Sequence, residues 1–132
     1  MKFILMMNMK TDAASMAGGI MTWAPEEIQA HIQFMIGLNH QLKTEGVLLA
    51  AEGLAWPDQA KLVRAAPNGA PVTDGVFAET KEFLMGYWIV DVTSAEAAYQ
   101  VAARASAAPG KGGAPLNMSI EVRQIMSGPP EA

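Results

Sequence analysis

The 132-residue sequence contains no cysteine, which excludes disulfide bonds and thiolate chemistry and fits a reducing compartment. Basic residues are also few: 9 Lys and Arg stand against 13 Asp and Glu, so no positive patch of the kind that nucleic-acid backbones require is expected. No stretch approaches the ~18 uninterrupted apolar residues of a transmembrane helix. We therefore expect a cytoplasmic protein that binds neither nucleic acid nor membrane.

Motifs for cofactors are missing as well. The two histidines, His31 and His40, fall on opposite faces of a predicted helix, which leaves no metal-binding pattern. The glycine-rich residues 110–113 lack the Ser or Thr and the spacing of a phosphate-binding loop. No serine lies in the context of a nucleophile elbow. We expect neither a metal ion nor a cofactor.

What the chain does contain is enough apolar material for one domain, since 51% of its residues are hydrophobic. Apolar patterns predict strands over residues 2–9, 47–54, 61–66, 83–92 and 116–126. Helix signals begin at Pro25, end at Gly46, and resume with a capping box at residues 93–96 for a second helix to about Ser106. We expect one domain over residues 1–126 and a flexible tail over residues 127–132.

The order strand, helix, strand pair, strand, helix, strand predicts an α+β fold of the ferredoxin-like kind, with helices on one face of an antiparallel sheet. Asn68-Gly69 predicts a hairpin turn, and Gly86 indicates a bulge or a close backbone approach. Thr93 is the expected cap of the second helix, and residues 109–115 are expected to form a flexible loop.

Three charged residues lie where an unpaired charge is costly. In the last strand, Glu121 and Arg123 alternate with apolar residues, so both project from one face of the sheet. Glu52 lies in an apolar segment. Each carboxylate is expected to pair with a cation, for which Lys81 and Arg123 are the candidates.

The first helix carries an apolar stripe at about 100° per residue, and a histidine interrupts it. The stripe consists of Ile28, His31, Ile32, Met35, Leu38 and Leu42. A histidine there can serve as an acid or base near neutral pH. Alternatively, it is a buried side chain that is satisfied by a backbone carbonyl.

The polar stretch over residues 73–82 resembles the "DGPF" signature of the YCII-related family, with Val76 in place of the proline. The resemblance extends over most of the chain in matching order: the opening strand, Pro25-Glu26-Glu27 with His31, Gly46-Val47, Ala51-Glu52-Gly53-Leu54, Gly86-Tyr87 and Ile120-Glu121-Val122-Arg123. It implies a homodimer in which two ferredoxin-like sheets face each other as an α+β barrel.

The resemblance also implies a site. His31 and Asp74 would form an acid/base pair, although Asp74 serves equally well to hold its own loop through an Asx-turn. Lys81 would bind an anionic substrate, and Glu52, Glu121 and Arg123 would line the same cavity.

Two classes of function remain open at this stage. The first is a cofactor-independent enzyme that acts on a small organic molecule by proton transfer. The second is a non-catalytic ligand-binding or regulatory module, which the resemblance links to sigma-factor regulation.

Overall fold

A computed structural model describes residues 1–10, 22–75 and 82–126 of the chain. In chain order its elements are β1 (Lys2–Lys10), α2 (Pro25–Thr44), β2 (Leu48–Gly53), a 3₁₀ turn (Pro57–Gln59), β3 (Lys61–Ala65), β4 (Pro71–Gly75), β5 (Glu82–Asp91), α3 (Ala95–Ser106), a second 3₁₀ turn (Lys111–Gly113) and β6 (Ile120–Gln124). Residues 11–21, residues 76–81 of the signature and the expected tail lie outside these ranges.

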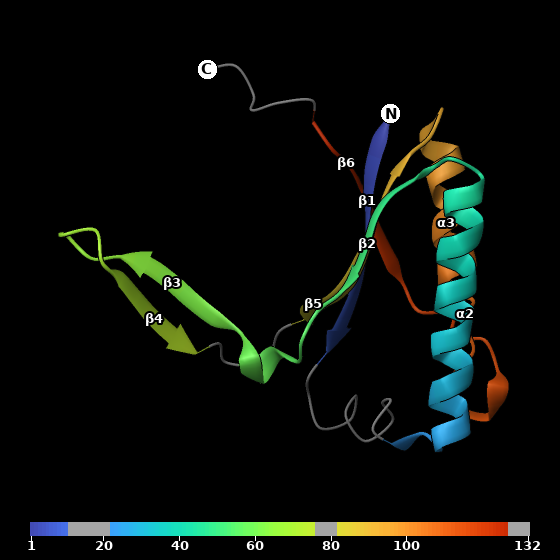
Figure 1. Cartoon of the computed structure of the whole chain (residues 1–132), viewed down its shortest axis with the longest axis horizontal. Coiled ribbons are helices and arrows are strands. Elements are labelled where there is room, and N and C mark those ends of the chain that lie inside the picture. The colour runs from blue at the N-terminus through green and yellow to red at the C-terminus, as the bar shows by residue number, and fades with distance from the viewer. Residues whose placement is uncertain (11–21, 76–81, 127–132) are drawn as a thin grey trace.

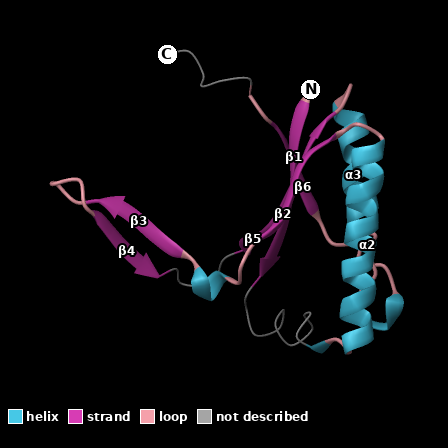
Figure 2. Cartoon of the chain, viewed as in Figure 1, coloured by secondary structure: helices cyan, strands magenta, loops and turns pink. Residues whose placement is uncertain are grey.

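Four strands form one antiparallel sheet in the order β2-β5-β1-β6. Both helices cover the same face of this sheet, as Figures 1 and 2 show. The predicted α+β architecture with helices on one face of an antiparallel sheet is therefore confirmed. Strands β1 and β5, the two apolar segments, occupy the centre, where each has a neighbour on both sides.

The core lies between the sheet and the helices. Leu5, Leu42 and Val90 are completely buried, and small alanines of α3 allow that helix to approach the sheet closely. Ile32, which the predicted stripe included, is instead 44% exposed. The stripe is narrower than predicted because Ile32 lies on its margin, about 100° around the helix from the midline between the two buried leucines of α2, Leu38 and Leu42.

A bulge interrupts the central strand pair. The register shifts after Met7, which pairs with Gly86, so that Asn8 pairs with Leu84 and Met85 is the extra residue. Gly86 is needed because a Cβ atom there would lie 3.0 Å from the Glu52 carbonyl oxygen. Both expectations for this glycine, a bulge and a close approach, are confirmed.

Helix α2 begins at Pro25 as predicted, whereas the cap of α3 differs from the prediction. Ser94, not Thr93, is the cap of α3, and its hydroxyl accepts a hydrogen bond from the Ala97 amide. In α2 the Glu27 carboxylate accepts a hydrogen bond of 2.8 Å from the Ala24 amide. The prediction placed the cap of α3 one residue too early, at Thr93, because Thr93 and Ser94 are adjacent and either hydroxyl can serve as a cap.

Strands β3 and β4 form a separate two-stranded hairpin that projects from the open side of the sheet, away from the helices (Figure 1). Gly69 has a φ of 85° and supplies the predicted turn. All residues of β3 are exposed, including Leu62 at 57% and Val63 at 62%. A lone hairpin is only marginally stable in water, so these apolar side chains lack cover in the single chain.

The segment between α3 and β6 is more ordered than predicted. The amide of Gly110 donates to the Ala114 carbonyl, that of Gly113 donates to the Gly110 carbonyl, and Pro109 bridges to Pro115. Strand β6 begins only at Ile120, because the chain before it turns through Asn117, which has a φ of 51°.

None of the described helices is long and apolar enough to cross a membrane.

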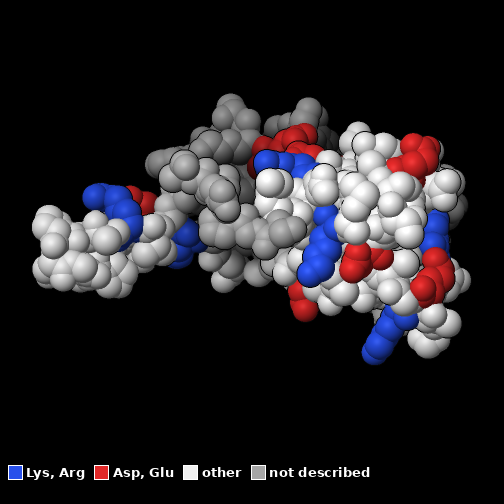
Figure 3. Space-filling model, turned by 90° about the horizontal axis from the view of Figure 1, so that it is seen from above, with Lys and Arg blue, Asp and Glu red and all other residues white. Residues whose placement is uncertain are grey.

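The surface seen from above in Figure 3 has no basic patch. The Lys and Arg side chains drawn there stand apart from one another and alternate with Asp and Glu.

We predict opposite effects for alanine at two glycines. Gly86→Ala should lower the free energy of unfolding by about 1–3 kcal/mol, because the new methyl group presses on the β2 backbone. Gly37→Ala in α2 meets nothing within 4 Å and should raise it by about 0.5–1 kcal/mol. Urea denaturation measures both, and a neutral or stabilising Gly86→Ala would contradict the close approach.

Candidate functional site

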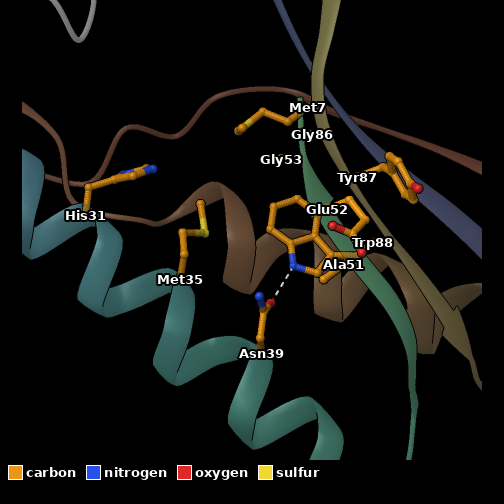
Figure 4. Close-up of a pocket in the computed structure, with 10 residues that line it drawn as sticks. All are labelled: Met7, His31, Met35, Asn39, Ala51, Glu52, Gly53, Gly86, Tyr87 and Trp88. Atoms are coloured by element: carbon orange, nitrogen blue, oxygen red, sulfur yellow. Dashed lines mark hydrogen bonds between the residues drawn. The ribbon is translucent and has the colours of Figure 1, made fainter. Parts of the chain in front are cut away.

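A cavity of about 160 Å³ lies between α2 and the β2–β5 end of the sheet. Its walls are mainly apolar and come from three strands and one helix: Met7, His31, Met35, Asn39, Ala51, Glu52, Gly53, Gly86, Tyr87 and Trp88 (Figure 4). The volume is close to the about 150 Å³ of a cavity that admits benzene and below the range for drug-sized ligands. The site therefore suits a small organic molecule.

The cavity exists because two paired residues have no side chains. Gly53 pairs with Gly86, and directly paired residues of antiparallel strands point to the same face of the sheet. That face is the one that α2 covers, since the next residue of β5, Tyr87, points away from the helix (Figure 4). A Cβ atom at Gly53 would meet nothing within 4 Å, so it would enter open space.

A partly buried hydrogen bond ties helix α2 to the sheet beside the cavity. The indole Nε1–H of Trp88, which is 5% exposed, donates to the Asn39 Oδ1 at 2.7 Å (Figure 4). Met35 and Asn39 lie on the same side of α2 as His31, one and two turns beyond it respectively, so all three face the sheet. This bond thereby determines where His31 stands relative to β5.

The His31 side chain is held by two residues outside α2, Pro109 and Trp23. Its Nδ1 lies 3.0 Å from the carbonyl oxygen of Pro109, and the edge of its ring meets Trp23 at a centroid distance of 5.5 Å. A carbonyl oxygen only accepts hydrogen bonds, so Nδ1 carries the proton. In the neutral ring Nε2 then has the lone pair, and it has no partner among the described residues.

This geometry combines the two interpretations of His31. As in the alternative reading, a backbone carbonyl satisfies one nitrogen, but the side chain is only half-buried and lines the cavity. The carbonyl does what a carboxylate does in an acid/base pair, because it fixes the tautomer and the ring orientation.

The remaining predicted residues lie elsewhere. Glu121 pairs with Met6, Met6 with Tyr87, and Tyr87 with Glu52, so this row crosses the open face of the sheet. Arg123 is in the next row, where it pairs with Ile4. The alternation predicted for the last strand thus holds for Glu121 and Arg123. The sheet separates both of them from His31, and Glu52 is at the rim of the cavity.

Asp74 is not brought to His31 within the described chain. It pairs with Leu62 in the projecting hairpin and is exposed (Figure 1). Its expected role beside His31 therefore has no support inside one chain.

Lys81 and Val76 lie outside the described residues. No ion pair of Glu52, Glu121 or Arg123 is found in the parts of the chain that the structure covers.

Sequence reasoning missed Asn39, Trp23 and Pro109. A signal existed for Asn39, since it is a polar residue next to Leu38 on the buried side of an amphipathic helix. No signal existed for Pro109, whose contribution is a backbone carbonyl delivered across 78 residues of sequence.

The sequence model of the YCII-related domain matches residues 1–114, which is most of the chain. No curated protein matches it.

We predict that Asn39→Ala costs about 1–3 kcal/mol of unfolding free energy, because the buried Trp88 Nε1–H loses its acceptor. The matched control is Gln33→Ala, an exposed residue of the same helix, which should stay within about 0.5 kcal/mol of the wild type. Chemical denaturation compares the two. Equal effects would show that the Trp88–Asn39 bond does not anchor α2.

Proposed function

Since this chain belongs to the YCII-related domain family, we propose that its cavity binds a small organic molecule and that His31 transfers a proton to or from it. One observation carries the proposal: the Pro109 carbonyl holds the proton on Nδ1, and Nε2 has no partner among the described residues. A free imidazole nitrogen at the wall of a small, largely apolar cavity is a suitable general base near neutral pH.

The proton transfer needs no cofactor. Nε2 takes a proton from an O–H, N–H or acidic C–H group of the bound molecule, and the imidazolium then returns it to another atom. The Pro109 carbonyl remains an acceptor for Nδ1–H in both states, so the ring does not have to rotate. Isomerisation, elimination and hydrolysis all fit this chemistry.

A non-catalytic binding module is the second candidate. It is favoured by the absence of any other acid or base in contact with His31 among the described residues. In that case Nε2 only accepts a hydrogen bond from the ligand, as in a binding or regulatory protein.

We further propose that two copies associate through the open face of the sheet. Ile4, Met6, Tyr87 and Ile89 are half-buried apolar or aromatic side chains on that face, and no described helix covers it. The β3–β4 hairpin projects on the same side, so a second copy would cover its exposed apolar residues and meet Asp74. Glu121 and Arg123 would then lie in an enclosed space.

Ligand binding provides the first test. In a thermal-shift screen of small metabolites, a compound that raises the Tm of the wild type should not raise that of His31→Ala or of Gly53→Val. The first variant removes Nε2 and the second fills the cavity without a backbone clash. His40→Ala, on the exposed side of the same helix, should behave as the wild type. Compounds that bind all four proteins equally would refute the assignment of the cavity.

The same compound separates the two candidate functions. Incubation in D₂O with the wild type should exchange a carbon-bound or product hydrogen for deuterium, and His31→Ala should lose about 10²–10⁴-fold of that rate. If the compound binds but neither exchanges nor turns over, the binding module is correct and the acid/base role of His31 is wrong.

Association is tested by light scattering at micromolar concentration. The wild type should be a dimer, and Ile89→Asp should be a monomer because a carboxylate in the apolar row of the open face cannot be desolvated without cost. Ile36→Asp changes an isoleucine that is 56% exposed on α2 and should remain dimeric. A monomeric wild type would contradict the proposal.

A further inference from the structure

We propose that Glu27 is a positioning residue whose carboxylate holds the loop of residues 109–115 in the place from which the Pro109 carbonyl fixes the tautomer of His31. The inference deepens the proposed function and rests on it only for its consequence, since the contacts themselves are independent of any reaction.

The carboxylate of Glu27 joins two segments that are far apart in sequence. Its Oε1 accepts a hydrogen bond of 2.8 Å from the Ala24 amide, at the start of α2. Its Oε2 accepts a hydrogen bond from the Gly112 amide, in the 109–115 loop. Each oxygen therefore has its own donor, and one side chain ties the loop to the first turn of the helix.

The loop transmits this constraint because its residues are bonded to one another. Gly110 donates to the Ala114 carbonyl at 2.8 Å, and Gly113 donates to the Gly110 carbonyl at 3.0 Å. A Cβ atom at Gly110 would lie 2.5 Å from the Leu116 Cδ2 and 3.3 Å from Trp23, so the loop is seated directly on both side chains. Pro109, next to this contact, presents its carbonyl to His31.

Glu27 and His31 hold the loop from neighbouring positions on α2. Glu27 and His31 are four residues apart, so they lie on the same face of α2, one turn from each other. The loop passes over this face and is held at both ends of that turn, by Glu27 through Gly112 and by His31 through Pro109. Without the first attachment, the described contacts that hold the loop over this face would be reduced to its packing on Trp23 and Leu116 and the bond to His31 itself.

The charge of Glu27 is suited to the role. Hydrogen bonds from the amides of Gly112 and Ala24, together with the nearby Lys111 ammonium, hold the pKa of this carboxyl below its ordinary value. Glu27 is therefore ionised at neutral pH and accepts both amides as charge-assisted hydrogen bonds, which are stronger than neutral ones.

The test is nitrogen-15 NMR of the His31 ring in wild type, Glu27→Ala and Glu27→Gln, because it reports which ring nitrogen carries the proton without any ligand. The wild type should hold the proton on Nδ1, and Glu27→Ala should show a mixture of tautomers. Exchange of the Gly112 amide with solvent should accelerate about tenfold or more, as expected on loss of a charged acceptor. Glu27→Gln keeps the shape and one acceptor oxygen, so it should give an intermediate result.

Glu26→Gln is the matched control. Glu26 is exposed in the same first turn, and its side chain makes no hydrogen bond within the described segments. The substitution should therefore leave both readouts unchanged, although it removes the same charge near the helix N-terminus. If Gly112 exchange accelerates in Glu27→Ala while the His31 tautomer stays fixed, the loop does not need Glu27 to orient His31 and the proposal is wrong. An unchanged exchange rate would also overturn it. A failed ligand screen would count against the proposed function and would leave this result intact.

Discussion

The hydrogen bond between Trp88 and Asn39 is the interaction on which the site depends. It connects the centre of the sheet to the middle of α2, and the buried Leu38 and Leu42 fix the same part of the helix against the core. Because an α-helix is rigid over two turns, anchoring Asn39 also sets the height of His31 above β5. The loop after α3 then has a defined target, and the Pro109 carbonyl meets Nδ1.

The cavity below His31 results from missing side chains and not from an opening between separate bodies. Gly53 and Gly86 are paired at the place where β2 ends, and the bulge at Met7 disturbs the same end of the sheet. Glycine at position 86 is required by the close β2 backbone, whereas glycine at position 53 has free space. Gly86 thus preserves the pairing of the sheet, and Gly53 preserves the room for a ligand.

Much of this arrangement could be predicted from the sequence, because it follows from local patterns. Alternation in the last strand predicted that Glu121 and Arg123 share a face, and the helical stripe predicted that His31 faces the sheet. Two other features do not follow from local patterns. The link between Asp74 and His31 rests on a family signature and stays a prediction, because in the single chain the hairpin that carries Asp74 lies away from α2. The partner of Nδ1 is a backbone carbonyl, which no side-chain pattern in a sequence reveals.

The central claim is that a small molecule meets the free Nε2 of His31 in the cavity beside Gly53. A crystal structure of the protein with a compound selected by its thermal shift tests this most directly. We expect the compound to occupy the cavity between α2 and β5, with a polar atom within hydrogen-bond distance of Nε2 and with Nδ1 still bonded to the Pro109 carbonyl. A compound bound elsewhere, such as the apolar hollow beside Trp56 and Phe83, with the His31 cavity empty, would contradict it.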